Sequence, residues 1–405
     1  MNSNNRSALV AVALLGLARP ASADVICDWN AKALDFVVGH KMLPPPAERI
    51  VAMTQLAMFD AVNSIDRKYR PYLVQLAAAP TVSKEAAAAA AAATVLAGVD
   101  PQTQDQIKAA LAAYLAAVPD GAAKSEGIKL GEAVAAKILE ARANDGANVP
   151  DTYRPRTAPG VYVPTAPTAT PQWPNVKPFA LTSASQFRPP PPPALTSAEW
   201  AASYNEIKEL GGRNSTKRSA QQTESARFWL ATDGRVHYPV IRTMVADKEL
   251  SVIDSARLFA LIAVARADAL IAVFDAKYAY EFWRPVTAIR NGDIDGNPAT
   301  ERDAAWQPID ATPMHPEYPC AHCTIGGAAR AVMESEFGDA VQFSVSTEAM
   351  PDTIRKYPSF ATFAEEEAYS RILGGIHFRN SLITGAAIGR KIGEQAVAKT
   401  MQPQS

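Results

Sequence analysis

Runs of alanine and aliphatic residues at helical spacing dominate this 405-residue chain and constrain its fold more than any other feature. They are clearest over residues 84–99, which include eight consecutive alanines, and over the strongly apolar stretch 251–280. Alanine is the best helix former, and small side chains let neighbouring helices approach closely. Period-two alternation, the pattern of a half-buried strand, is confined to a few residues near 341–345. The sequence therefore predicts an all-α fold, packed as helical bundles.

Caps and breakers set the limits of the expected helices. Ser197 is a suitable N-cap with Glu199 in the first turn that follows, and the Asp100-Pro101 step separates two alanine-rich helices. From the apolar periodicity we expect helices over residues 28–38, 47–63, 84–99, 102–117, 122–144, 197–210, 219–230, 237–247 and 251–280.

Composition divides the chain into four regions, of which the last carries the candidate site. The third region has a proline every few residues and ends in the run 189–193, so we expect extended chain there, either as a linker or as a strap over the helices. The regions are a signal peptide at 1–23, an N-terminal helical region at 24–147, the proline-rich excursion at 148–195 and a C-terminal helical region at 196–405.

The N-terminus has the pattern of a secretory signal peptide. Arg6 precedes an apolar run at 8–18, and the small residues 21–23 form a cleavage site. We therefore expect an exported protein, periplasmic or secreted, whose mature chain begins near Asp24. No later apolar run reaches the roughly 18 residues that a membrane helix needs, so no membrane span is expected in the mature protein.

Charge and cysteine content narrow the classes of function. A net charge of −1 without a basic block argues against nucleic-acid binding. Cys320 and Cys323 form a C-x-x-C motif, and Cys27 leaves an odd count for an oxidising compartment. A zinc site would need a second pair of ligands, and a thioredoxin-like site would need a βαβ context. The motif remains open to interpretation as a redox pair, half of a zinc site or a coincidence of packing.

The segment 277–285 places two cations in an apolar context. Lys277 and Arg284 are seven residues apart, so a helix would project both from one face, and Pro285 marks the end of that helix. The two charges repel each other unless an anion lies between them. Solvated charges on a surface helix are the alternative interpretation.

The segment 370–381 combines Arg371 and His377 around a pair of glycines that allow the backbone to bend. An arginine can hold an anion while the imidazole contacts it. Ser381, one helical turn after His377, is positioned to fix the imidazole tautomer, with Asn380 as a competing partner. A surface arginine and a satisfied core histidine are the structural alternative.

The segment 315–324 has prolines followed by small residues that open an apolar helix. Free N–H groups and the positive end of the helix dipole bind anions at such an N-terminus. His322 would lie beside the anion as a proton donor or acceptor, whereas His315, in the preceding loop, is expected to have a structural role.

The order of these motifs resembles the three-part signature of the vanadium-dependent haloperoxidases and of the type 2 phosphatidic acid phosphatases that share their site. Further similarity extends over nearly the whole mature chain and points to the soluble, exported bacterial haloperoxidase-like branch. The matching segments are 60–63, 69–72, 228–229, 283–290 and 374–379, together with Lys277 to Arg284-Pro285, Pro319-x-x-His322 and Ser370-Arg371 with the following His377.

The resemblance implies helical bundles of the vanadium haloperoxidase type and a site for vanadate, which phosphate would also fit. His377 would be the axial vanadate ligand, and therefore the metal ligand, in a peroxidase, or the phosphate-accepting nucleophile in a phosphatase. His322 would be the acid–base residue, and the backbone N–H of Ala321 would donate to the oxyanion. The cations that would neutralise the equatorial oxygens are Lys277, Arg284 and Arg371.

Two residues depart from the family pattern. Cys320 stands where the family has a serine, so a strong hydroxyl donor to the oxyanion becomes a weak thiol donor that peroxide can oxidise. Ser381 stands where an aspartate orients the ligand histidine, which leaves His377 less basic unless Asn380 or an outside carboxylate compensates.

Three functions follow from these residues. The first is a vanadate-dependent peroxidase that oxidises halide with hydrogen peroxide. The second is an exported acid phosphatase that hydrolyses phosphoesters through a phospho-histidine. The third is an oxyanion-binding or redox-responsive protein with little turnover, in which Cys320 and Cys323 form a disulfide or sense oxidant. In each of them the partners are small molecules, and a homodimer is compatible with the resemblance.

Overall fold

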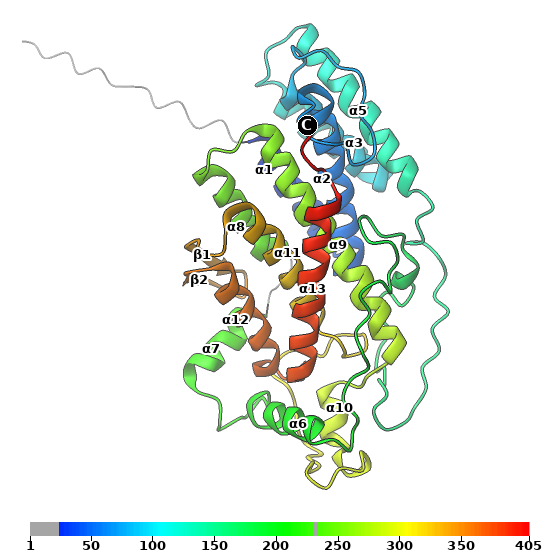
Figure 1. The fold of residues 1–405 in the computed structure, drawn as a ribbon, viewed down its shortest axis with the longest axis vertical. Helices are drawn as coiled ribbons and strands as arrows, with labels where there is room; N and C mark the ends of the chain where they lie inside the picture. Colours follow the sequence, from blue (N-terminus) through cyan, green and yellow to red (C-terminus); the bar gives the residue numbers. More distant parts are fainter. Residues whose placement is uncertain (1–23, 231–233, 405) are drawn as a thin grey trace, which may run out of the picture.

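The computed structural model describes residues 24–230 and 234–404, and within them the chain is mostly helical (Figure 1). The expected signal peptide lies outside the described residues. The α-helices are α1 (Val25–Gly39), α2 (Pro44–Asp66), α3 (Lys84–Val99), α4 (Gln104–Leu115), α5 (Ala122–Arg142), α6 (Ala198–Leu210), α7 (Ala220–Phe228), α8 (Gly234–Asp247), α9 (Val252–Tyr280), α10 (Pro285–Arg290), α11 (Ala321–Phe337), α12 (Phe360–Leu373) and α13 (Arg379–Lys399). The predicted all-α class is confirmed.

The alanine tract of α3 lies in the core of the N-terminal bundle. Its alanines are buried, and α3 packs against α2 and α5 at one end of the molecule (Figure 1). Side chains this small let the three helices lie close together, which is the arrangement that the composition predicted. Ser83 caps α3 by accepting a hydrogen bond from the N–H of Ala86. The region predicted as one helix over 102–117 begins instead with a short 3₁₀ turn at Pro101–Thr103.

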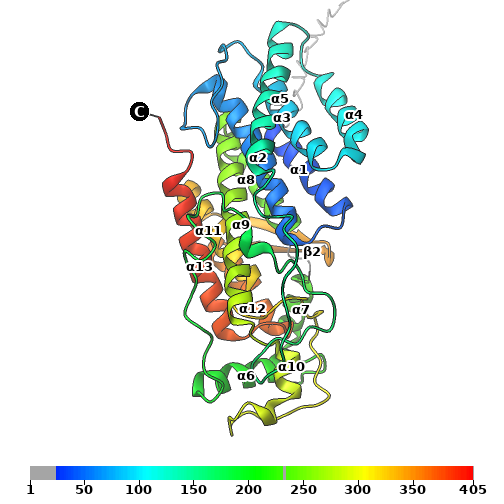
Figure 2. The same ribbon diagram turned by 90° about the vertical axis from the view of Figure 1, so that its right-hand side faces the viewer.

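Helix α9 is the central element of the fold. It packs against α2 from the N-terminal bundle and against α11 and α13 from the C-terminal part, as Figure 2 shows. Ser251 caps it, and nearly every residue between Ile253 and Lys277 is buried. The helix ends where Glu281 adopts a left-handed backbone conformation, with φ of 49°. Because α9 is buried on all sides, it holds its last turn, which carries Lys277, deep inside the protein.

The proline-rich region is a strap over α9. The carboxylate of Asp268 on α9 accepts hydrogen bonds from the N–H groups of Phe179, Ala180 and Leu181 at 2.7–2.9 Å. Further along, Arg188 forms a two-bond ion pair with Asp275, also on α9. These contacts support the strap and exclude the freely moving linker that the proline content also allowed.

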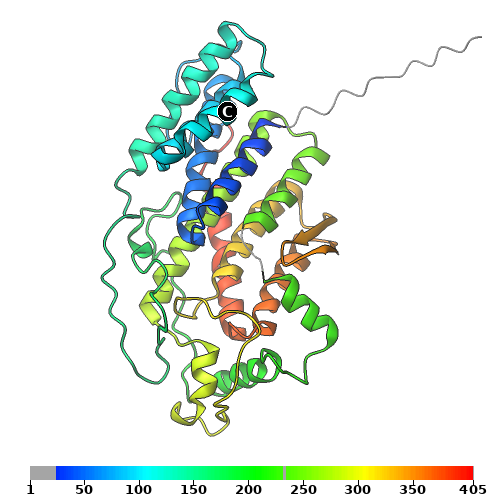
Figure 3. The ribbon, with the colours of Figure 1, turned by 180° about the vertical axis from the view of Figure 1, so that it is seen from behind.

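A two-stranded antiparallel sheet interrupts the helical pattern at the molecule's edge (Figure 3). Strand β1 (Phe343–Thr347) overlaps the short alternation seen in the sequence, whereas its partner β2 (Met350–Tyr357) was not expected. Phe343 and Val345 of β1 are buried and the residues between them are exposed, so the sheet covers the core with one face. Over the described residues, no helix is long and apolar enough to cross a membrane.

Candidate oxyanion site

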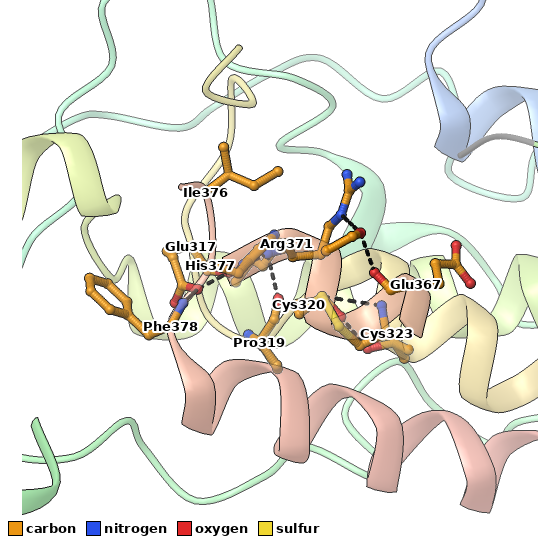
Figure 4. Close-up of a disulfide and its surroundings, with 12 residues drawn as sticks. Glu317, Pro319, Cys320, Cys323, Glu367, Arg371, Ile376, His377 and Phe378 are labelled. Atoms are coloured by element: carbon orange, nitrogen blue, oxygen red, sulfur yellow. Dashed lines mark hydrogen bonds and ion pairs between the residues drawn. A yellow bond between two sulfur atoms is a disulfide. The ribbon is translucent and has the colours of Figure 1, made fainter. Parts of the chain in front are cut away.

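The candidate site lies where the ends of several helices meet. Lys277 is in the last turn of α9, Arg284 caps α10, His322 is in the first turn of α11, and Arg371 is in the last turn of α12. His377 follows in the connection to α13 (Figure 4). The turn before His377 requires glycine at position 375, because φ is 81° there and a Cβ atom would come within 2.5 Å of the Gly211 carbonyl oxygen. The bend predicted from the glycine pair is therefore present.

Lys277 is completely buried and binds backbone oxygen atoms. Its ammonium group donates to the carbonyls of Pro316, Glu317 and Pro319 at 2.9, 2.7 and 2.5 Å. Burial lowers the pKa of this ammonium well below its usual value, and the positive charge of Arg284 adds to the effect. The lysine thus fixes the loop before α11 and adds positive charge that an anion would stabilise.

Arg284 joins that loop to His377. Its guanidinium donates to the carbonyls of His315 and Ile376 at 2.9 Å each and to Nδ1 of His315 at 3.0 Å. A further N–H lies 3.3 Å from Nε2 of His377. The continuous helical face predicted for Lys277 and Arg284 is wrong, because α9 ends at Tyr280. The chain turns there, and the two cations meet from different elements.

His377 receives its orientation from Glu317. The Nδ1 atom of His377 lies 2.7 Å from Oε1 of Glu317, and both side chains are almost fully buried. Arg284 can only donate, so it directs a hydrogen to Nε2 and leaves the imidazole proton on Nδ1, facing the carboxylate. The Nε2 lone pair of a neutral His377 is therefore turned toward the cations, as a ligand or nucleophile requires.

The prediction that Ser381 or Asn380 fixes this tautomer is wrong. Ser381 is buried near the Glu317 carboxylate, and among the described residues its hydroxyl has no hydrogen-bond partner. Burial raises the pKa of Glu317 to about 7, although Lys277 and Arg284 oppose the shift. The sequence allowed for an outside carboxylate but did not single out Glu317, which lies 60 residues before His377. The only signal available was its place inside the motif 315–324.

His322 and His315 line a cavity of about 670 Å³ between α1, α2, α9 and α11. Most of its walls are apolar, and its volume is in the range of small-molecule sites. Burial lowers the pKa of His322 well below its usual value, and the positive charges of Arg371 and Lys277 lower it further. His322 is thus a neutral base beside an accessible space. His315 contributes to the site through Arg284, beyond the structural role expected for it.

Arg371 completes the group of cations. It is buried, and its guanidinium donates to the carbonyl of Trp229 and, at 3.1 Å, to the hydroxyl of Ser370. Asp310 lies 3.6 Å away as a partly exposed counter-charge. The positive charge of Arg371 also lowers the pKa of His322, so the guanidinium adds to the buried positive charge of the site.

Cys320 has a different role from the predicted thiol donor. A disulfide joins it to Cys323, so the prediction that its thiol binds the cofactor is wrong. The sulfur of Cys320 instead accepts the N–H of Cys323 and caps α11. The first N–H groups of an α-helix have no acceptor within the helix, so that of Ala321 is available to an oxyanion.

Over the described residues there is no group of three or more His, Cys, Asp or Glu side chains suited to a metal ion.

The donor set fits an oxyanion such as vanadate or phosphate. Lys277, Arg284 and Arg371 are all nearly inaccessible to solvent, and the pKa of each is lowered because burial disfavours its charged form. A bound anion would offset this buried positive charge. The residues that would hold it are these three cations, Ala321 through its N–H, and His377 through Nε2.

The helical bundles have the fold of the vanadium haloperoxidase type. Comparison with known families agrees, because residues 257–405 match the second helical-bundle domain of VCPO. The chain is also 32% identical over 187 residues to vanadium chloroperoxidase from Curvularia inaequalis. That match covers 38% of this chain and only 30% of the length of the fungal protein.

Solved structures match a larger share of the chain than the fungal sequence does. A bacterial vanadium-dependent iodoperoxidase matches with a TM-score of 0.80 and 27% identity, over 95% of this chain and 97% of the other. An apo-type bacterial vanadium-dependent chloroperoxidase has the same fold, with a TM-score of 0.73 and 20% identity, over 87% of this chain and 92% of that one. The resemblance expected from the sequence motifs is confirmed.

Proposed function

We propose that this protein is a vanadate-dependent haloperoxidase that uses hydrogen peroxide to oxidise a halide. The observation that carries the proposal is the pairing of His377 with Glu317, which turns the Nε2 lone pair toward a buried group of cations. The likeness to a bacterial vanadium-dependent iodoperoxidase over the whole chain supports it. When bound, vanadate would supply the activation of peroxide toward halide.

The residues of the chain would then have separate tasks. His377 would hold vanadium through Nε2, while Lys277, Arg284 and Arg371 neutralise the oxygens. His322, neutral because its pKa is lowered, would accept a proton from hydrogen peroxide and return one to the departing oxygen. The cavity beside His322 would admit the small substrates.

The disulfide removes one objection to this function. A free thiol at Cys320 would be oxidised by peroxide in the site, whereas a disulfide sulfur offers no thiolate. We therefore expect the oxidised pair to persist during turnover. An oxidising compartment would maintain it, in agreement with the proposed export of the protein.

The experiment is to add orthovanadate to the purified, metal-free protein and assay oxidation of iodide and bromination of a phenol dye with peroxide. We expect activity that depends on vanadate and is lost in His377→Ala, with Lys137→Met as a matched surface control. Absence of vanadate-dependent halide oxidation from acidic to neutral pH would refute the proposal.

A phosphatase is the second candidate, because the same cations and the same Nε2 lone pair suit phosphoryl transfer. His322 would then have to protonate the leaving oxygen. The phosphatase hypothesis predicts hydrolysis of an aryl phosphate that orthovanadate inhibits and that His377→Ala abolishes. Hydrolysis that survives this substitution would come from another site.

A further inference from the structure

Four buried side chains, one from each of four helices, form a chain beside the oxyanion site. Arg266 of α9 donates to Oε1 of Glu48 on α2 at 3.1 and 2.5 Å, and it lies 2.9 Å from Nδ1 of His237 on α8. Nε2 of His237 lies 3.0 Å from Oε2 of Glu367 on α12. At most 6% of any of these residues is exposed to solvent. None of them has a task in the proposed reaction.

The direction of each hydrogen bond in this chain is fixed. Arg266 has only donors, so Nδ1 of His237 must accept and the proton of the imidazole is on Nε2. From there it is donated to Glu367. His237 therefore holds the carboxylate of Glu367 in one orientation, and Arg266, itself fixed by Glu48, holds His237.

Glu367 lies next to the anion-binding cations. It precedes Arg371 by one turn of α12, and its negative charge acts on the guanidinium. On its other side the carboxylate contacts α11 at Gly326, one turn after His322. A Cβ atom at position 326 would be 3.0 Å from Oε2 of Glu367, so the glycine makes room for the carboxylate. Among the described residues, Oε1 of Glu367 has no hydrogen-bond partner.

We propose that His237 is a positioning residue that sets the oxyanion affinity of the site by holding the Glu367 carboxylate away from the guanidinium of Arg371. Without the hydrogen bond from His237, the carboxylate turns toward Arg371, four residues along the same helix face. The ion pair then competes with the bound anion. This inference rests on the oxyanion site of the proposed function, but it concerns affinity and not turnover.

The test measures binding of orthovanadate and of inorganic phosphate by calorimetry. His237→Phe should weaken both by about tenfold or more, because a freed carboxylate near Arg371 opposes the anion. His237→Gln should retain the affinity, since its amide oxygen can accept from Arg266 while its N–H₂ donates to Glu367. Adding Glu367→Gln to His237→Phe should restore binding, because the amide carries no charge.

A role in folding alone predicts a different pattern. The two substitutions together would then bind no better than His237→Phe, and that result would overturn the proposal, as would unchanged affinity in His237→Phe. If His237→Phe does not fold, the ¹⁵N spectrum of His237 in the unsubstituted protein decides. A proton on Nε2 at pH 8 supports the arrangement, and a proton on Nδ1 refutes it.

The outcome separates this inference from the proposed function. Normal anion binding with the expected pattern of variants, but without halide oxidation, would sustain the role of His237 and reject the haloperoxidase. An unsubstituted protein that binds neither anion would remove both.

Discussion

Glu317 places a carboxylate oxygen 2.7 Å from Nδ1 of His377, from a position 60 residues earlier in the chain. The same carboxylate also accepts the N–H of Phe378 at 3.1 Å, so it fixes both the imidazole and the backbone that carries it. The acid that orients the candidate ligand thus comes from the loop before α11, and α13 supplies only Ser381 beside it.

Removal of the Glu317 carboxylate should strongly weaken the binding of vanadate. Because Glu317 fixes the tautomer and the orientation of His377, Glu317→Ala should weaken vanadate binding by about 10- to 100-fold, as is usual when a group that orients a ligand histidine is lost. Ser381→Ala, the matched control, should have a much smaller effect. Dissociation constants from calorimetry measure both. The reverse ranking would show that the serine orients the histidine after all.

The raised pKa of Glu317 makes stability depend on pH. Its pKa is about 7 in the folded protein against 4.5 for the ordinary group, so the folded state retains a proton that the unfolded chain releases in this window. The stabilisation is present below the lower value and is lost as pH rises through the window. From about pH 5 to pH 8, the wild type should lose roughly 2 to 3 kcal/mol relative to Glu317→Gln. Denaturant unfolding of both proteins at each pH tests this, and a constant difference would contradict it.

Loss of the buried ammonium should abolish tight anion binding. Lys277→Met keeps the apolar stem but removes a charge and the donor to three carbonyls. We expect vanadate affinity to fall by at least about 100-fold, since an unpaired anionic oxygen in a desolvated site costs several kcal/mol. Lys137→Met is the control, because Lys137 is exposed and paired only with Glu140. Equal affinities in the two variants would place the anion elsewhere.

The disulfide predicts a simple thiol count. In denaturant without reductant, one thiol per chain should react, that of Cys27, and reduction should reveal three. In the folded protein even Cys27 should react slowly, because burial and the charge of Asp24 raise its pKa to about 12. Mass spectrometry after alkylation gives the counts. Three reactive thiols before reduction would exclude the disulfide.

The strap should depend on one carboxylate. In the unsubstituted protein the Asp268 carboxylate accepts three backbone N–H groups. Asp268→Asn keeps the size of the side chain but replaces one of these acceptor oxygens with an amide N–H₂, which can only donate. The cost should be about 1 to 3 kcal/mol of unfolding free energy. Faster hydrogen exchange should be confined to residues 179–181. Exposed Asp105→Asn is the control, and equal exchange in the two variants would show that the strap is held by other contacts.

Local features of the sequence predicted local structure well. The N-cap at Ser197 and the apolar periodicity gave the limits of the nine expected helices within a few residues, because a cap and the helix that it begins are adjacent in the chain. The order of the motifs predicted the cations and two histidines of the candidate site. The close approach of Arg284 to His377 agrees with that prediction.

Contacts between distant segments were the part that the sequence left open. Nothing in the spacing of 315–324 indicated that Glu317 reaches His377, or that Lys277 binds the carbonyls of the same loop. The proline content predicted extended chain over 148–195, but its docking depends on Asp268 and Asp275, which lie on the distant helix α9. Strand β2 was missed because its burial alternates only weakly.

The loop leading into α11 and the first turn of that helix carry the carbonyls that bind Lys277, the carboxylate that orients His377, the disulfide and His322, all within a few residues. Anyone who wishes to transplant this centre into another helical scaffold must therefore move residues 315–323 as an intact cassette. Introducing the signature residues one at a time would supply side chains that contact the anion, but not the hydrogen bonds that orient them.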